Sequence, residues 1–214
     1  MADITVSEAD LLVVVDMQND FMPGGALAVP NADLAIPVVN RLAGRFRHVV
    51  LTQDWHPPNH VSFASSHSGR AAHDLITLPY GAQMLWPDHC IQESAGAALV
   101  PDLYIPHAEL ILRKGHRRQI DSYSAFYEND RRTPTGLRGY ARERGFRRIF
   151  LAGLAFDFCV RFSAEDAHRG GFSVVVVEDA CRAIDVAGSV SETRTSFALR
   201  NVILTLSDAV TAGR

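Results

Sequence analysis

The chain has 214 residues, a formal net charge of −3, and hydrophobic and charged fractions of 47% and 21%. These fractions are those of an ordinary globular protein, so they argue against intrinsic disorder and against a fibrous or low-complexity chain. Acidic and basic residues are interspersed, which leaves no broad positive field to bind nucleic acid or an anionic lipid surface. A basic run at 113–118 is the exception, and we interpret it as a solvated loop.

The first residues of the chain lack the basic segment and apolar stretch of a secretory signal peptide. No apolar run approaches the length that crosses a bilayer. We therefore expect a cytoplasmic protein without a membrane partner. The three cysteines, Cys90, Cys159 and Cys181, form an odd set, which argues against a disulfide framework and favours reduced thiols. The sequence leaves open whether the chain forms a homo-oligomer.

Short β-branched runs alternate with helix-patterned segments along the chain. Strands are predicted at 11–15, 48–52, 110–112, 148–152, 172–177 and 202–205. Helices are predicted at about 34–46, 134–144, 157–169 and 189–199. Strands that are apolar on both faces and alternate with helices indicate a parallel sheet. We expect one α/β domain over residues 1–214, with a doubly wound, mainly parallel six-stranded sheet and helices on both faces, a Rossmann-like three-layer arrangement.

The segment from about 56 to 106 breaks this alternation, because it is rich in Pro, Ser, His and Gly. Irregular segments of this length in compact domains tend to be functional lids or binding loops. It has no linker composition and no internal repeat, so it does not divide the domain. We expect it to carry a metal site and to cover a binding site.

Polar side chains collect where the predicted strands end. Asp16 ends the first run, Asp54 and His56 follow the second, Lys114 follows the third, and Cys159 opens the helix after the fourth. In open α/β sheets, ligands bind outside the carboxyl ends of the strands, where loops converge and helix N-termini point into the crevice. The sequence therefore predicts a site with an acid, a base and a nucleophile at this edge.

Each of these residues has a plainer interpretation when it is taken alone. Asp16 could cap a turn, Lys114 could be solvated, and Cys159 could be a small buried apolar residue. Together they supply a proton acceptor, a cation and an attacking sulfur. The expected helix start at Cys159 also brings a positive dipole end and free N–H groups, which favour a thiolate. The combination predicts nucleophilic chemistry at Cys159.

Asp54, Trp55 and His56 suggest a metal site, because alternate residues of an extended chain place a carboxylate and an imidazole on one side. His89, in the irregular segment, is a third candidate ligand. One carboxylate and two imidazoles with open positions suit catalytic zinc, iron or manganese. The alternative is a set of ordinary hydrogen-bonded histidines.

Six motifs together resemble bacterial nicotinamidases, also called pyrazinamidases, of the isochorismatase-like cysteine hydrolase superfamily. They are Val-Asp-Met-Gln-Asn-Asp-Phe at 15–21, Thr-Gln-Asp-Trp-His at 52–56, Trp-Pro-Asp-His-Cys at 86–90, Lys-Gly at 114–115, Asp-Ser-Tyr-Ser-Ala-Phe at 121–126 and Gly-Leu-Ala-Phe-Asp-Phe-Cys-Val at 153–160. The resemblance runs in order from about residue 11 to 207. The second and third motifs point to the metal-containing nicotinamidase branch.

The resemblance implies a catalytic trio, in which Cys159 is the nucleophile, Asp16 the proton shuttle and Lys114 the charge that holds them ready. It also implies a cis peptide bond between Leu154 and Ala155. The backbone N–H groups of Ala155 and Cys159 would then form an oxyanion hole.

The same resemblance implies that Asp54, His56 and His89 bind one divalent metal ion, with zinc expected and iron or manganese as alternatives. The fourth ligand is left open between Ser62 and His60.

The implied activity is hydrolysis of nicotinamide, and also of pyrazinamide, through a thioester, as a step of NAD salvage. Phe21, Leu27, Trp86 and Tyr123 are expected to contact the substrate. Phe156 and Phe158 depart from the Thr and Tyr common in relatives, which leaves substrate preference open. Two alternatives remain: another amidohydrolase of the superfamily, acting on a maleamate- or carbamoyl-type substrate, and a non-catalytic ligand-binding or redox-sensing protein.

Overall fold

The computed structural model describes residues 3–213 and contains a six-stranded, wholly parallel sheet. The strand order is β6-β3-β2-β7-β8-β9. The strands are β2 (Asp10–Val15), β3 (Val49–Asp54), β6 (Leu110–Lys114), β7 (Arg148–Leu154), β8 (Ser173–Arg182) and β9 (Ile203–Thr205). The predicted doubly wound sheet is confirmed. Strand β8 continues to Arg182, five residues beyond the predicted end at 177, because a register irregularity opposite Leu151 and Gly153 lets it keep pairing with β7.

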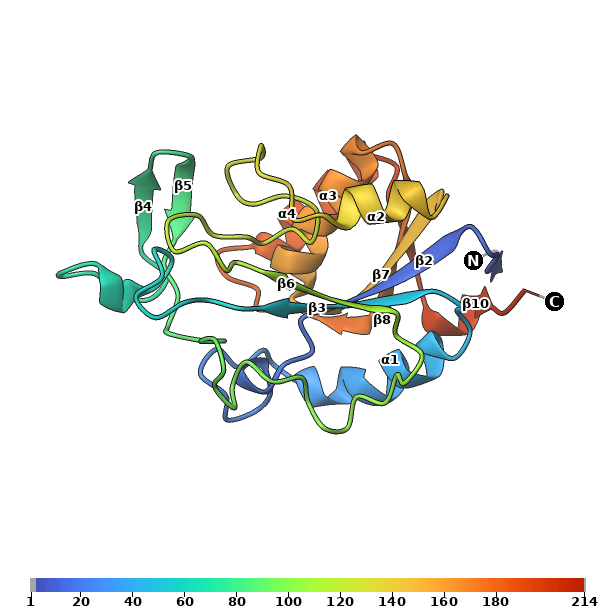
Figure 1. Ribbon diagram of the computed structural model, residues 1–214, viewed down its shortest axis with the longest axis horizontal. Helices are drawn as coiled ribbons and strands as arrows, with labels where there is room; N and C mark the ends of the chain where they lie inside the picture. The colour runs from blue at the N-terminus through green and yellow to red at the C-terminus, as the bar shows by residue number, and fades with distance from the viewer. Residues whose placement is uncertain (1–2, 214) are drawn as a thin grey trace.

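Helices cover both faces of this sheet, as Figure 1 shows, with α1 (Ile36–Ala43) below it and α2 (Leu137–Glu143) and α3 (Arg161–Arg169) above. The fourth helix, α4 (Ser189–Leu199), lies beside α3. The first predicted helix is shorter than expected, because Ala32–Ala35 forms a 3-10 turn that precedes α1. The predicted helix at 157–169 begins instead with a π-helical turn over Phe156–Val160 and continues as α3.

The core consists of two apolar clusters, one on each face of the sheet. Side chains of β2 alternate between them: Leu12 and Val14 pack with α1, and Leu11 and Val13 pack with the helices of the other face. This alternation is what a strand buried on both faces requires.

The irregular segment contains two short strands, β4 (Leu75–Leu78) and β5 (Gly81–Met84), which form an antiparallel hairpin at one end of the molecule (Figure 1). A 3-10 turn spans Ala64–Ser66. Near the chain ends, β1 (Ile4–Thr5) pairs with β10 (Val210–Thr211), and a 3-10 turn spans Ser207–Ala209 just before β10. Within residues 3–213, no helix combines the length and apolar character of a membrane span.

Four adjacent strands of the sheet carry the predicted site. Strands β6, β3, β2 and β7 are consecutive neighbours, and all run in the same direction. Lys114 and Asp54 end β6 and β3, Asp16 follows β2, and Cys159 comes five residues after the end of β7. Parallel pairing therefore brings these four residues to one edge of the sheet, as the sequence predicted.

Candidate active site

Lys114 lies at the centre of the predicted trio and is completely buried. Its Nζ is 2.8 Å from Asp16 Oδ2 and donates a hydrogen bond to Cys159 Sγ over 3.4 Å. It also donates to Asp54 Oδ1 and, over 2.9 Å, to the carbonyl oxygen of Ser122. The ammonium thus contacts two carboxylates, one backbone carbonyl and the sulfur.

The conformation of Asp16 directs its carboxylate toward the lysine. Its backbone turns out of β2 with φ of 50°, and its N–H donates to Thr52 Oγ1 over 3.1 Å. The Thr52 hydroxyl donates in turn to Asp16 Oδ1. Asp16 Oδ2 forms the ion pair with Lys114, and an oxygen of the Asp16 carboxylate lies within 4.8 Å of Cys159 Sγ. Thr52 lies in the Thr-Gln-Asp-Trp-His motif, but nothing in the sequence alone distinguishes it as a functional residue.

Burial raises the pKa of the Cys159 thiol well above its usual value, although Lys114 opposes the shift. The carboxylates of Asp16 and Asp54 raise that pKa further. Burial also raises the pKa of Asp16, again against the effect of Lys114. Burial and the two carboxylates therefore oppose a thiolate at Cys159, whereas Lys114 favours the thiolate that the sequence predicts.

The second predicted set, Asp54, His56 and His89, is also brought together. Asp54 Oδ2 lies 3.7 Å from His56 Nε2 and 3.9 Å from His89 Nε2. All three side chains are buried, and their ligand atoms fall within 4.8 Å of one another.

The donor atoms of this set fit a divalent metal ion. His56 donates through Nδ1 to the carbonyl of Gly115 over 2.9 Å, and His89 donates through Nδ1 to that of Pro87 over 2.8 Å. In the neutral imidazoles, each Nε2 then presents its lone pair toward Asp54. Burial lowers the pKa of His89 to about 4, which favours a neutral ring. Burial also opposes the charged form of His56, but the Asp54 carboxylate raises the pKa of this histidine, so a metal ion would displace a proton there.

The two candidates for a fourth ligand contact each other. His60 Nδ1 lies 2.7 Å from Ser62 Oγ, and His60 Nε2 faces the carbonyls of Arg117 and Ile120 at 3.1 and 3.3 Å. The His60 ring stacks on that of His56 with centroids 4.3 Å apart. Both nitrogens of His60 are thus engaged by protein groups, while its ring packs on that of His56, a candidate metal ligand.

Asp121 is a buried acid near this set to which the sequence assigned no role. Its carboxylate groups with His56 and His60 within 4.8 Å, and it accepts hydrogen bonds from Gln83 and from the Ser122 backbone. It lines the same pocket as Asp54. It had appeared within a quoted motif, yet neither its spacing nor its charge distinguished it from a turn residue.

One pocket joins the trio to the metal set. Cys159, Ala155, Asp54, His56 and His89 line it, and the four predicted substrate contacts, Phe21, Leu27, Trp86 and Tyr123, line it too. The Leu154–Ala155 peptide bond is cis, as the resemblance implied.

Phe158, one of the two departures from relatives, lines this pocket, and so does Ile184, which the sequence did not single out. Phe158 packs edge-on against Trp86 with ring centroids 4.9 Å apart, and the Trp86 indole donates to the Tyr123 hydroxyl over 3.0 Å. Phe156, the other departure from relatives, packs in the core against Phe197 at 5.7 Å and does not line the pocket.

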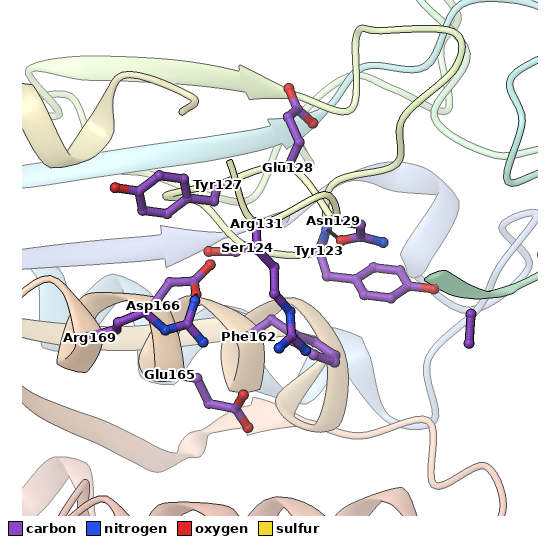
Figure 2. Close-up of a pocket in the computed structure, with 11 residues that line it drawn as sticks. Tyr123, Ser124, Tyr127, Glu128, Asn129, Arg131, Phe162, Glu165, Asp166 and Arg169 are labelled. Atoms are coloured by element: carbon purple, nitrogen blue, oxygen red, sulfur yellow. Dashed lines mark hydrogen bonds and ion pairs between the residues drawn. The ribbon is translucent and has the colours of Figure 1, made fainter. Parts of the chain in front are cut away.

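A second pocket lies on the other side of Tyr123, between the loop at 123–131 and α3 (Figure 2). Arg131 extends over Phe162 there, and Glu165, Asp166 and Arg169 project from α3. Among the residues that line it, Tyr123 alone is shared with the first pocket. Neither the trio nor the metal set contributes to it, so the candidate chemistry is confined to the first pocket.

Fold and site correspond to a known family. The isochorismatase domain family matches residues 10–208, so the chain belongs to this family. The chain is 52% identical over 191 residues to the nicotinamidase of Acinetobacter baylyi, an alignment that covers 88% of this chain and 89% of that protein.

Two solved structures are similar over nearly the whole chain. The nicotinamidase and pyrazinamidase of Acinetobacter baumanii has a TM-score of 0.94 and 51% identity, with 94% of this chain and 98% of that chain covered. The PnC1 protein of L. infantum, solved in complex with nicotinate, has a TM-score of 0.86 and 40% identity, with 99% and 100% covered.

Proposed function

We propose that this protein is a nicotinamidase, which hydrolyses nicotinamide to nicotinate and ammonia. One observation carries the proposal: Cys159, the Asp54, His56 and His89 set, and a wall of aromatic rings all line a single pocket. A flat heteroaromatic amide matches this combination, because its ring suits the aromatic wall and its carboxamide requires a nucleophile. Pyrazinamide has the same shape and is expected to be a second substrate.

Asp16 begins the reaction by taking the Cys159 proton on its carboxylate, because Lys114 contacts both this carboxylate and the sulfur. The sulfur attacks the amide carbon as the proton leaves, so the high pKa of the thiol is overcome during the step and no free thiolate is stored. Lys114, in contact with both groups, stabilises whichever of them is negative.

The N–H groups of Ala155 and Cys159 stabilise the oxyanion that forms as the S–C bond is made, and loss of one such donor typically costs about 3 kcal/mol. Protonated Asp16 then gives its proton to the amide nitrogen, the C–N bond breaks, and ammonia leaves behind a thioester. Asp16 next takes a proton from water, whose oxygen attacks the thioester carbon. The C–S bond then breaks, and Asp16 returns this proton to the sulfur, which regenerates the thiol and releases the acid product as nicotinate.

Asp54, His56 and His89 hold one divalent ion in this proposal, with zinc expected from the mixed imidazole and carboxylate donors. Such an ion would supply a Lewis-acid contact for the ring nitrogen of the substrate. Phe21, Leu27, Trp86 and Tyr123 orient the ring so that its carboxamide faces Cys159. We place the enzyme in the cytoplasm, as one domain acting in NAD salvage.

The direct test is an ammonia-release assay with nicotinamide on purified protein, with metal content measured on the same sample. Cys159→Ala is the matched control, because alanine is small and apolar and suits the buried position. We expect ammonia from the wild-type protein and none from the variant. Hydrolysis of a non-aromatic amide in preference to nicotinamide would contradict the proposal, as would turnover by Cys159→Ala.

A further inference from the structure

Strand β3 extends beyond its neighbour β2. The last residue pair between them is Val14 with Leu51, whereas β3 continues to Asp54. Strand β2 ends at Val15, and the chain turns away at Asp16. On the other side, β6 stays paired with β3 up to Asp54 and Lys114. The peptide groups of Asp54 that face β2 therefore have no strand to pair with.

The side-chain amide of Gln18 occupies this position. The Asp54 N–H donates to Gln18 Oε1 over 2.8 Å, and Gln18 Nε2 donates to the Asp54 carbonyl over 2.8 Å. The second N–H of that amide donates to the carbonyl of Ala97 over 2.9 Å. Gln18 is completely buried. It therefore pairs with Asp54 as a strand residue would, and satisfies two backbone groups that burial would otherwise leave unpaired.

The orientation of the Asp54 peptide matters because the two oxygens of its carboxylate have different partners. Oδ1 accepts a hydrogen bond from Lys114, and Oδ2 faces the Nε2 atoms of His56 and His89. A small rotation of the peptide would move both oxygens together, away from the lysine or away from the imidazoles.

We propose that Gln18 is a positioning residue that holds the Asp54 carboxylate between Lys114 and the two histidines, and so sets the metal affinity of the site. This inference rests on the metal site of the proposed function. Groups that orient metal ligands from outside the coordination sphere typically change metal affinity by about 10- to 100-fold when they are removed.

Gln53 provides a matched control. It is the same residue type, is buried, and donates through Nε2 to the same Ala97 carbonyl over 3.0 Å. Gln18→Met and Gln53→Met each remove a bond to Ala97 and keep an unbranched side chain. Only Gln18→Met also removes the two bonds to the Asp54 peptide.

The experiment measures zinc affinity of the metal-free proteins by competition with a chromophoric chelator, together with near-UV circular dichroism and the thermal midpoint of each. We expect Gln18→Met to bind zinc about 10- to 100-fold more weakly than wild type, and Gln53→Met to bind it about as well as wild type. The KM for nicotinamide should rise with the lost affinity, and kcat of the zinc-saturated variant should change less.

If Gln18→Met fails to fold, Gln18→Asn replaces it, because asparagine keeps an uncharged amide but is one methylene shorter and is therefore withdrawn from the Asp54 peptide. Equal zinc affinities for the Gln18 and Gln53 variants would overturn the positioning role. A wild-type protein that hydrolyses nicotinamide but binds no zinc would overturn both the metal site and this inference, while leaving the cysteine chemistry in place.

Discussion

Lys114 donates a hydrogen bond to the sulfur of Cys159 over 3.4 Å, and both side chains are buried. The same ammonium contacts the carboxylates of Asp16 and Asp54, so one cation serves three groups that can carry negative charge. The lysine therefore stabilises negative charge wherever it lies as a proton moves from Cys159 to Asp16.

Replacing Lys114 by Met should destabilise the protein strongly, because two buried carboxylates lose their cation. Removing one partner of a buried ion pair typically costs about 3–5 kcal/mol. The free energy of unfolding, measured in urea, should fall by about that amount.

The loss should depend on pH in a defined direction. Without Lys114, the folded-state pKa values of Asp16 and Asp54 rise above their unfolded values, because burial raises both and Lys114 was the main opposing charge. A raised pKa gives stability that is present at low pH and is lost as the pH rises. The deficit of Lys114→Met should then be smaller at about pH 5 than at about pH 8. A deficit independent of pH would show that packing, not charge, accounts for it.

Asp16→Asn should separate proton transfer from electrostatics. Hydrolysis should fall by about 10²- to 10⁴-fold, because the base is gone. The thiol should nevertheless ionise more easily, since the Asp16 carboxylate raises the pKa of Cys159 in the wild-type protein. The check is the rate of Cys159 alkylation by iodoacetamide as a function of pH, followed by mass spectrometry. A midpoint in the variant that is equal to or higher than the wild-type midpoint would contradict this account.

The fold could be predicted from the sequence because hydrophobic periodicity determines which strands are buried on both faces. Val13 and Val14, for example, are both apolar, and each packs on a different side of β2. Strand ends were less predictable. Strand β8 is longer than the apolar run that predicts it, because its pairing with β7 resumes after a register irregularity. The pattern of side chains in the sequence does not reveal such a shift in backbone pairing.

The candidate site could be predicted where side-chain chemistry is distinctive, and not where a common residue acts through geometry. Asp16, Lys114 and Cys159 were found from their positions at strand ends. Thr52 and Gln18 were not assigned roles, because a hydroxyl or an amide becomes informative only when its partner across the sheet is known. The surroundings of the Cys159 sulfur were only partly predictable for a related reason: its position after a strand can be inferred from the sequence, whereas the buried acids Asp16 and Asp54 that raise its pKa are brought to it by the fold.

Metal removal should affect substrate binding more than it affects the cysteine. Treating the protein with a chelator, or replacing His89 by Ala, should raise the KM for nicotinamide by about 10-fold or more, because the ring would lose one of its contacts. The rate of Cys159 alkylation should change little, since Lys114 and Asp16 stay in place. Both quantities can be measured on one preparation, with zinc added back as the control. If alkylation changes while KM does not, the ion acts on the nucleophile instead.

Phe158 should determine how tightly the ring of the substrate is held. It lines the pocket and packs against Trp86 at 4.9 Å and against Tyr123 at 5.7 Å. A contact between the Phe158 ring and the substrate ring is expected to contribute about 0.5–1.5 kcal/mol beyond the area that it buries. Phe158→Ala should therefore raise KM by at least about 2- to 12-fold. The kcat should change little, because Lys114 makes none of its hydrogen bonds or ion pairs with Phe158.

Phe162→Ala is the matched control for that measurement. Phe162 also packs against Tyr123, with ring centroids 5.3 Å apart, but it lines the second pocket (Figure 2). Steady-state kinetics with nicotinamide and pyrazinamide should show a raised KM for Phe158→Ala and an unchanged KM for Phe162→Ala. An equal rise in both variants would mean that the position of Tyr123, and not direct contact with Phe158, sets the affinity for the ring.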